Sequence, residues 1–465
     1  MTSAIELAHH EARRARLLER VGGTVLLLGN GPRARNLPMT DLPFRQDSTF
    51  LYFTGCDLPG AAALLRAGRF ELFLPEPGEE DALWHGPTPS LEELGARFGA
   101  DRVRPAHTLA AEVPGDARVL AVADEAVNSR AAAWTGRRLA FGRDHGDEAL
   151  MDAVISLRRT KGPEEVAEMR AAAAATRQAF EATMQATVPG SHERGLWTLF
   201  EGVLRLNGCT TGYDTILTQS GEILHHHGHG APLEAGRLVL LDGGGERIAS
   251  GYTVDITRTW PVSGVFTPRQ RAAYDAVLEA QRVAIEACTV GRPYREVHDA
   301  ASLVLARFLA DEGLLRGTPE GIVEQHAHAL FFPHGVGHHL GLDVHDLENF
   351  GDRPSYAPGA SRPEPFGTRN LRLDLPLEAG WVVTIEPGFY VVPAILANTT
   401  LRERFRGVLQ EERAQSWLGF GGVRIEDDVH VTPDGPEVLT DVPKAPDAIE
   451  AIVGQGPTAE ARLCP

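Results

Sequence analysis

Two aspartates near the middle of the chain have the residue type and the setting of a catalytic or metal-binding pair. Asp242 ends the apolar run RLVLLD, and Asp255 lies in the next strand-like run, YTVDITRTW, after a glycine-rich loop. A hairpin over this segment would bring the two carboxylates side by side. Because a buried carboxylate without a partner is costly, a positive group should then lie between them. The alternative is that both aspartates cap turns, since Asp beside Gly is ordinary turn chemistry.

Two glutamates occur in similar apolar settings closer to the C-terminus. Glu386 lies in VVTIEPGFYVV, and Glu426 lies in GGVRIEDDVHV. Successive side chains of a strand point to opposite faces, so the second run has one polar face, formed by Arg424, Glu426 and Asp428. A polar face on a strand of a core sheet indicates a site. The alternative is that each glutamate lies on a strand face that is exposed to solvent.

A histidine-rich segment lies between these acidic runs. FFPHGVGHHLGLDVHD contains His334, His338, His339 and His345, and its glycines disfavour a regular helix. The segment has no HExxH motif, which excludes the common helical zinc-protease arrangement. A single histidine here would be typical of a core or a surface, whereas four of them favour a metal or acid–base site.

The four carboxylates and one imidazole form a set that suits metal chemistry. Asp242, Asp255, Glu386 and Glu426 carry four negative charges, which two divalent cations with a bridging hydroxide would nearly neutralise. Mostly oxygen ligands favour Mn²⁺, with Co²⁺ or Zn²⁺ as alternatives. Two such ions lower the pKa of a shared water and polarise a carbonyl, so the predicted reaction is hydrolysis.

Composition excludes several other classes of protein. The 465 residues are enough for more than one domain, and 45 Lys and Arg against 63 Asp and Glu give a net charge of −18. This charge disfavours nucleic acid and anionic lipid as partners. No apolar run has the length of a membrane helix, and the first residues lack a signal-peptide core, so we expect a cytoplasmic protein. The 4 cysteines are scattered, which argues against a thiolate metal site.

The first part of the chain reads as alternating short strands and helices. Apolar runs of strand length occur at Thr24–Leu28, Phe50–Phe53, Ala61–Leu65 and Phe70–Leu74. Ser90 and the glutamate three residues later form a capping box that opens a helix. We therefore expect an amino-terminal α/β domain over residues 1–155 and a second domain over 156–465.

The second part mixes long helices with strand-like runs. We expect helices from Glu164 to about Thr187, from Thr267, which opens a capping box, to about Cys288, and from Tyr294 to about Leu314. The strand-like runs cover 237–242, 253–262, 381–392 and 422–431. This pattern predicts an α+β fold in which helices cover one face of a curved antiparallel sheet. The Pro- and Gly-rich stretch over 352–368 is expected to form a surface loop.

At these residues the sequence resembles the pita-bread metallopeptidases of the aminopeptidase P and prolidase branch. The supporting motifs are VDITRTW, HGVGHHLGLDVHD, TIEPGFY and GGVRIEDD, together with FRQDSTFLYFTG near the N-terminus. The resemblance implies a non-catalytic amino-terminal domain of creatinase/aminopeptidase P type, followed by a pita-bread catalytic domain. The ligand order of the family, Asp, Asp, His, Glu and Glu, matches Asp242, Asp255, His338, Glu386 and Glu426.

The resemblance also implies roles for single residues. One ion would be held by Asp242, Asp255 and Glu426, and the other by Asp255, His338, Glu386 and Glu426. Glu386 would pass a proton from the nucleophile to the leaving nitrogen. Arg424 matches an arginine behind the second glutamate and is assigned to substrate binding. Three histidines match positions near the substrate, namely His225, His334 and His345.

Two features depart from the pattern of the family. The spacing between the two aspartates is longer than usual, and the segment between Tyr213 and His225 is shorter, so His225 is the least supported assignment. The neighbouring His226, His227 and His229 belong either to a mobile loop or to an adventitious metal site.

The implied substrate is a peptide or dipeptide with proline in the second position. Arg372 matches the arginine with which prolidases bind the free carboxylate of a dipeptide, whereas FLYFTG is more typical of aminopeptidase P. We expect a slight preference for dipeptides. The resemblance also implies a homodimer or homotetramer.

Two rival functions share parts of this pattern. A methionine-aminopeptidase-like enzyme would have the same ligands but would not need the amino-terminal domain. A catalytically inactive pita-bread module that binds a partner protein would typically have lost ligands, whereas all five are present. Metal-free chemistry of the creatinase type is disfavoured for the same reason.

Overall fold

The computed structural model describes residues 5–37, 40–78 and 81–464. The chain divides into two compact units. The first contains the residues up to Arg159 together with Ala249–Gly251 and Leu347–Pro354, and the second contains the remainder. No helix among the described residues is long and apolar enough to cross a membrane.

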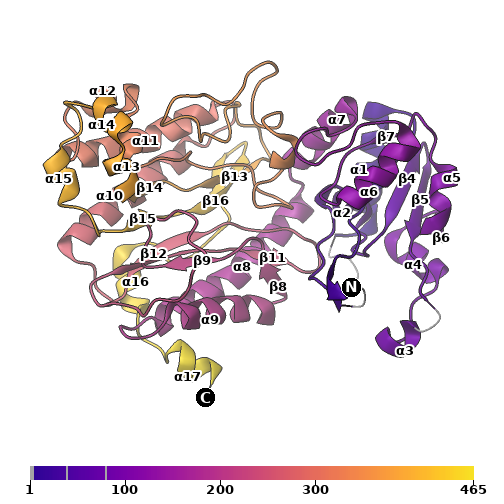
Figure 1. Ribbon diagram of the computed structural model, residues 1–465, viewed down its shortest axis with the longest axis horizontal. Coiled ribbons are helices and arrows are strands. Elements are labelled where there is room, and N and C mark those ends of the chain that lie inside the picture. The colour runs from indigo at the N-terminus through magenta and orange to yellow at the C-terminus, as the bar shows by residue number, and fades with distance from the viewer. Residues whose placement is uncertain (1–4, 38–39, 79–80, 465) are drawn as a thin grey trace. The chain divides into compact units, whose positions relative to one another are not determined.

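The first unit is built around a mixed sheet (Figure 1). Its strands follow the order β6-β5-β4-β1-β7, with β1 antiparallel to β4 and parallel to β7. The strands of this unit are β1 (Val25–Leu28), β2 (Ala34–Leu37), β3 (Thr40–Asp41), β4 (Ala62–Arg66), β5 (Arg69–Leu74), β6 (Arg102–Pro105) and β7 (Arg118–Val119). Its helices are α1 (Leu7–Val21), α2 (Ser48–Thr54), α3 (Asp81–His85), α4 (Leu91–Phe98), α5 (Leu109–Glu112), α6 (Glu125–Thr135) and α7 (Glu148–Arg159).

One predicted strand of this unit is wrong. The run Phe50–Phe53 lies in helix α2, not in a strand. The Asp47 side chain accepts a hydrogen bond from the backbone N–H of Phe50 and caps the helix, and Gly55 ends it with φ 64°. A short apolar run has no period that separates strand from buried helix, so its caps decide the structure. The helix predicted after Ser90 is confirmed as α4, with both hydrogen bonds of the capping box formed.

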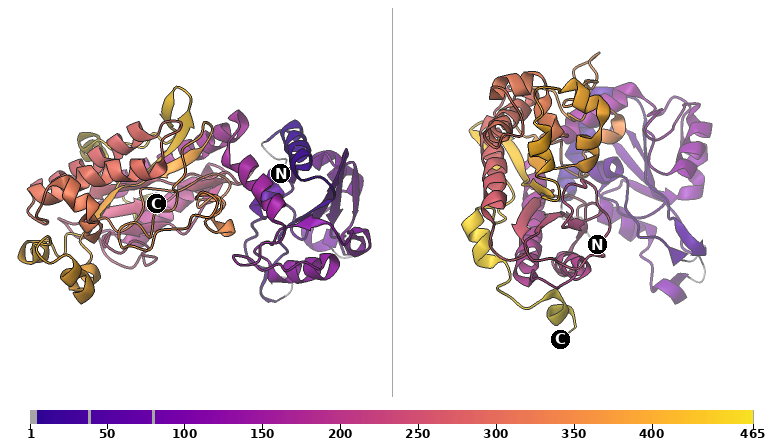
Figure 2. Two further views of the ribbon diagram at one scale, coloured as in Figure 1. Left: turned by 90° about the horizontal axis from the view of Figure 1, so that it is seen from above. Right: turned by 60° about the vertical axis from the view of Figure 1, so that its left-hand side comes forward.

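Long helices of the second unit begin where the sequence predicts. Helix α8 (Pro163–Ala186) starts with proline in its first turn, and α10 (Pro268–Ala287) starts at the Thr267 capping box. Figure 2 shows α10 beside α11 (Tyr294–Asp311), along one side of the strands. The other helices are α9 (Glu193–Leu206), α12 (Pro319–Glu324), α13 (Pro393–Ala397), α14 (Thr399–Arg404), α15 (Glu411–Gln415), α16 (Pro446–Ile452) and α17 (Ala459–Leu463).

Strand pairs of the second unit are antiparallel, as predicted. The sheet orders are β12-β10-β9, β13-β16-β17, β14-β15 and β11-β8. The strands are β8 (Cys209–Thr211), β9 (Ile216–Thr218), β10 (Leu238–Asp242), β11 (Gly245–Arg247), β12 (Thr257–Pro261), β13 (Val382–Ile385), β14 (Gly388–Tyr390), β15 (Gly422–Arg424), β16 (Asp427–Thr432) and β17 (Gly435–Val438). The stretch predicted as a loop over 352–368 contains no helix or strand.

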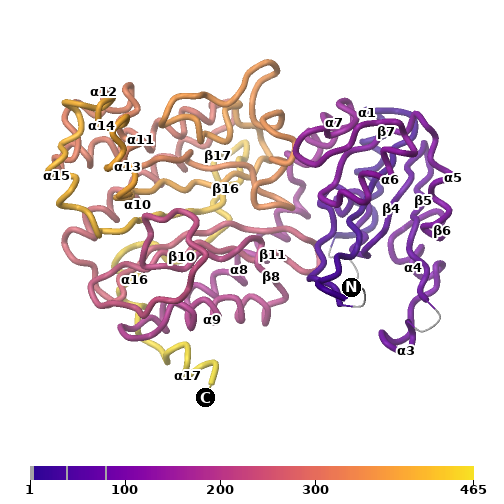
Figure 3. Tube along the Cα trace, viewed as in Figure 1, coloured from indigo at the N-terminus to yellow at the C-terminus, as the bar shows by residue number. Residues whose placement is uncertain are grey.

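Three strand-like runs are shorter or more broken than predicted, and the breaks fall at the acidic residues. The run over 253–262 is a strand only from Thr257, so Asp255 precedes it. The run over 381–392 breaks after Ile385, where Pro387 lacks the N–H of a ladder bond. The run over 422–431 breaks at Glu426. Figure 3 shows the chain path through these strands.

Candidate metal centre

The acidic residues at the strand ends meet in one buried cluster. Asp255, His338 and Glu426 each offer a ligand atom, and these atoms lie within 4.8 Å of one another. The Nε2 atom of His338 is 3.5 Å from Asp255 Oδ2 and 3.7 Å from Glu386 Oε1. Pairing of β10 with β12 brings Asp242 opposite Thr257, close to Asp255. The bridge between Thr257 and Glu426 brings the second glutamate to the same point.

The orientation of His338 suits a metal ligand. Its Nδ1 lies 3.0 Å from the backbone carbonyl of His339, and its backbone N–H donates to the Thr384 hydroxyl at 3.1 Å. When Nδ1 donates its proton to that carbonyl, Nε2 carries the lone pair and faces the carboxylates. Burial lowers the pKa of His338, but contact with Asp255 and the charge of Glu386 outweigh it and raise the pKa.

Three of the four carboxylates of the cluster have too few positive partners; burial raises the pKa of the fourth, Asp255, but contact with His338 outweighs burial and lowers it. Burial raises the pKa of Glu386 to about 7, against the charges of His338 and Arg424. Burial, and then the charges of Asp255 and Glu386, raise the pKa of Glu426 far above its usual range. Burial also raises the pKa of Asp242. Divalent cations would supply the missing charge, so the donor set fits the predicted ligands.

A tyrosine that sequence reasoning missed joins the two aspartates. The Tyr213 hydroxyl lies 2.7 Å from Asp242 Oδ1 and also contacts Asp255 Oδ1. Burial, and then the charges of the two aspartates, raise the pKa of Tyr213 well above its usual range, so the phenol keeps its proton. One proton cannot serve both carboxylates at once, which is a further sign of missing positive charge. Tyr213 lies far from both aspartates in sequence, and no motif marks it.

Arg424 lies inside the cluster. Its Nη2 donates to Asp242 Oδ2 at 2.5 Å, its Nη1 to the Tyr390 hydroxyl at 3.0 Å and its Nε to the Thr257 hydroxyl at 3.1 Å. The guanidinium thus pairs directly with the first aspartate, and it reaches Glu426 only through Thr257, whose hydroxyl donates to Glu426 Oε2 at 2.6 Å.

The three predicted substrate histidines lie around this cluster. The His345 ring is 4.5 Å from the His338 ring, and burial, then the charge of His338, lowers its pKa to about 2. His334 Nδ1 is 3.6 Å from Glu386 Oε2, and burial lowers the His334 pKa to about 3. Both imidazoles are therefore neutral at pH 7.

His225 and Arg372 interact electrostatically with residues of the cluster. Desolvation, and then the charges of Arg424 and Arg372, lower the pKa of His225, although this side chain is exposed. The charge of Arg372 also lowers the pKa of His334 and His345.

The extra histidines after His225 have separate surroundings. The His229 ring stacks on Trp197 at 4.9 Å, and its Nδ1 lies 3.1 Å from the Leu217 carbonyl. Glu193 accepts hydrogen bonds from the backbone N–H groups of Gln219 and Ala231. Glu193 therefore binds the backbone at both ends of the segment 219–231, which carries His225.

Known proteins resemble this chain over nearly its whole length. Residues 167–433 match metallopeptidase family M24, and residues 10–121 match the aminopeptidase P N-terminal domain. The Xaa-Pro dipeptidase of Homo sapiens is 31% identical, with 97% of this chain and 94% of that protein covered. A probable Xaa-Pro aminopeptidase of Penicillium rubens is 32% identical, with 89% of each covered.

Solved structures of aminopeptidases are also similar to this chain. The aminopeptidase PepP of Pseudomonas aeruginosa has a TM-score of 0.79 at 30% identity and covers 97% of this chain and 98% of its own. The Zn-substituted aminopeptidase P of E. coli, in complex with product, has a TM-score of 0.78 at 27% identity, with 96% and 98% covered. These similarities confirm the resemblance and the α+β fold class inferred from the motifs. The chain belongs to metallopeptidase family M24 and is an enzyme of that family with an aminopeptidase P N-terminal domain.

Proposed function

We propose that this enzyme hydrolyses the bond between an N-terminal residue and a following proline, with two divalent metal ions. The observation that carries the proposal is the buried set of Asp255, His338 and Glu426, with ligand atoms within 4.8 Å of one another. Asp242 joins this set through the Tyr213 hydroxyl, which contacts both aspartates, and Glu386 joins it through His338. Similar proteins are named Xaa-Pro aminopeptidase and Xaa-Pro dipeptidase, which supports the proline specificity.

The five residues would share two ions. Asp255 and Glu426 would contact both, Asp242 would complete one site, and His338 and Glu386 would complete the other. Four carboxylates with one guanidinium, that of Arg424, leave an excess of negative charge that a single divalent ion would not neutralise. Mostly oxygen donors favour Mn²⁺, with Co²⁺ or Zn²⁺ as alternatives.

Divalent ions at this centre would supply an activated water at neutral pH and polarise the substrate carbonyl. Glu386 would accept the proton of that water and return it to the leaving nitrogen, the role of a general acid–base. His345 would donate to charge that develops on the carbonyl oxygen. His225 and His334 would line the same substrate space.

Arg372 supports a preference for dipeptides. The charge of Arg372 lowers the pKa of His225, His334 and His345, the three histidines proposed to line the substrate space. A guanidinium there would pair with the free carboxylate of a dipeptide, and a longer peptide would not present that group at the same distance.

A substrate pair with metal titration tests the proposal. The purified enzyme, stripped with chelator and reloaded with Mn²⁺, should bind two ions per chain and hydrolyse a Xaa-Pro dipeptide faster than a Xaa-Pro-Yaa tripeptide. An Xaa-Ala dipeptide is the matched control for proline. Equal turnover of the Pro and Ala dipeptides would contradict the proline specificity, and saturation at one ion would contradict the dinuclear centre.

Three further expectations belong to this proposal. The non-catalytic domain would cover residues 1–155 and the catalytic domain 156–465. The enzyme would act in the cytoplasm as a homodimer or homotetramer. Light scattering of the purified chain would test the oligomeric state.

A further inference from the structure

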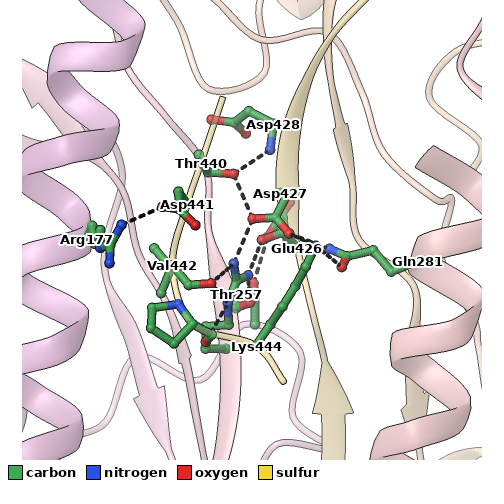
Figure 4. Close-up of polar contacts among 12 residues, drawn as sticks. Arg177, Thr257, Gln281, Glu426, Asp427, Asp428, Thr440, Asp441, Val442 and Lys444 are labelled. Carbon is green, nitrogen blue, oxygen red and sulfur yellow. Dashed lines mark hydrogen bonds and ion pairs between the residues drawn. The ribbon is translucent and has the colours of Figure 1, made fainter. Parts of the chain in front are cut away.

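A second buried polar group, centred on Asp427, lies next to Glu426 of the candidate metal centre (Figure 4). The Asp427 carboxylate is fully buried. It accepts hydrogen bonds from Arg258 Nη2 at 2.7 Å, Lys444 Nζ at 2.6 Å, the Thr440 hydroxyl at 2.7 Å and Gln281 Nε2 at 3.0 Å. Asp427 thus has two cations as partners, while its neighbour Glu426 faces the metal centre.

Arg258 connects this group to the backbone of Glu426. Its Nη1 donates to the Glu426 carbonyl at 2.6 Å and to the Thr257 carbonyl at 2.9 Å, and its Nη2 also donates to the Val442 carbonyl at 2.9 Å. Glu426 lies in the break between β15 and β16. The guanidinium therefore provides a hydrogen bond where the regular strand is interrupted.

Thr257 holds Glu426 from the other side. The backbone N–H of Glu426 donates to the Thr257 carbonyl at 3.0 Å, and the Thr257 hydroxyl donates to Glu426 Oε2. The first two residues of β12, Thr257 and Arg258, thus contact the backbone and one carboxylate oxygen of Glu426. Fixing a ligand in advance lowers the entropy lost when an ion binds.

The segment after β17 supplies the remaining partners. Thr440, Val442 and Lys444 all contact Arg258 or Asp427. The Thr440 hydroxyl also accepts from the backbone N–H of Asp428, at 3.1 Å. Asp428 in turn accepts from the backbone N–H of Asp255, at 3.2 Å. The segment Thr440–Lys444 therefore reaches the backbones of both residues proposed to contact both ions.

We propose that Arg258, Asp427 and Lys444 form a buried ionic clamp that positions Glu426, so that the segment Thr440–Lys444 sets the metal affinity of the enzyme. The proposal rests on the proposed function, because it takes Glu426 as a metal ligand. The three residues are positioning residues and touch neither metal nor substrate. Loss of one charge from a buried pair leaves the other charges uncompensated, so the clamp responds strongly to a single substitution.

Lys444 is the residue to change, because its side chain is 30% exposed and tolerates substitution better than Arg258 or Asp427. Lys444→Met removes the ammonium group and keeps the length, and Lys444→Arg restores a cation. The matched control is Asp441→Asn, which breaks the exposed ion pair of Asp441 with Arg177 in the same segment (Figure 4). Mn²⁺ dissociation constants are measured on full-length proteins by competition with a chelating dye.

We expect Lys444→Met to weaken Mn²⁺ binding by about 10- to 100-fold, the usual effect of removing a group that orients a ligand. Lys444→Arg should recover most of the affinity, and Asp441→Asn should match the wild type. Turnover of Lys444→Met should fall at low Mn²⁺ and recover at saturating Mn²⁺, which a general loss of folded protein would not produce.

Two outcomes overturn the clamp and are distinguishable. If wild type binds Mn²⁺ and Lys444→Met binds it equally well, even with a lower melting temperature, the clamp is refuted while the metal centre stands. If wild type itself binds no divalent ion, the metal centre and the clamp both fail. Should Lys444→Met not fold, Thr440→Val removes one donor to Asp427 with little change of shape, and unchanged Mn²⁺ affinity in that variant would equally refute the clamp.

Discussion

Glu426 and Asp427 are adjacent in sequence and buried to the same degree, yet their surroundings differ in charge. On the Glu426 side, burial and the neighbouring carboxylates raise the pKa of the carboxyl far above its usual range. On the Asp427 side, burial raises the pKa, but the charges of Arg258 and Lys444 outweigh it, and the pKa of Asp427 is lowered. Two adjacent residues, one in the break before β16 and one at its start, therefore face regions of opposite electrostatic balance.

The charge balance around a buried acid distinguishes a candidate metal ligand from a structural residue. The Asp427 region contains its own cations, so its carboxylate contributes to the folded structure without any ligand. The metal centre has Arg424 beside Asp242 and His338 beside Asp255 and Glu386, whereas the charges of the neighbouring carboxylates disfavour ionisation of Glu426. Burial alone therefore does not indicate function, whereas a buried excess of one charge does.

The largest expected effect is the loss of metal from the acidic side. Asp255→Asn or Glu426→Gln should abolish Mn²⁺ binding and turnover together, because each residue is proposed to contact both ions. Metal analysis, peptide turnover and circular dichroism would be measured on the same samples. Full hydrolysis by either variant with no bound metal would break the comparison, because the excess of negative charge would then have no catalytic purpose.

The same chemical change one residue further should act on stability. Asp427→Asn keeps the shape but leaves Arg258 and Lys444 without their carboxylate, so the free energy of unfolding should fall by about 3–5 kcal/mol. Urea unfolding of the metal-free protein measures this. Asp434→Asn, at an exposed acid near the end of the same strand, is the control and should stay within about 0.5 kcal/mol of wild type. If the free energy of unfolding falls no more than in the control, the ion pairs of Asp427 do not contribute to stability.

His345→Ala should impair chemistry and spare the metal. Its imidazole is proposed to act on charge that develops in the transition state, so kcat should fall by about 10²-fold, with a far smaller change in KM. Bound Mn²⁺ should remain at the wild-type level. His430→Ala, at a histidine paired with Glu437, is the control. If His345→Ala instead has near-normal kcat and a lower melting temperature, His345 only packs.

Arg372→Ala should change substrate choice. Loss of a charge-assisted hydrogen bond to the dipeptide carboxylate should cost about 2–3 kcal/mol of transition-state stabilisation, so kcat/KM for Xaa-Pro dipeptides should fall by about 30- to 150-fold. Turnover of tripeptides should not change. Arg369→Ala, three residues earlier and stacked on Phe366, is the control. Equal losses on both substrates would argue against carboxylate pairing and would favour an aminopeptidase.

The smallest effect concerns the pH dependence of the metal-free protein. Folding raises the pKa of Glu386 from 4.5 to about 7, so the folded protein holds a proton that the unfolded chain has released in that window. The free energy of unfolding should therefore fall as pH rises from about 4.5 to about 7. Glu386→Gln should flatten this slope in thermal melts, and an unchanged slope would assign it to other groups.

Local sequence patterns anticipated much of this fold. The capping boxes at Ser90 and Thr267 begin helices where expected, and the alternation from Arg424 to Asp428 places Glu426 and Asp427 on opposite sides. The misread run was Phe50–Phe53, where Asp47 and Gly55 enforce a helix. Patterns within one turn or one strand are readable because they depend on neighbours in sequence.

The sequence by itself determined which side chains could bind a metal, because carboxylate and imidazole chemistry is a property of residue type. Only the tertiary structure decided which of them lie together and which acids have cations of their own. Tyr213 lies beside Asp242 and Asp255, and Lys444 beside Asp427, because of strand pairing and chain reversal over long separations. Charge balance in a buried site depends on distance in space, and no local pattern records that distance.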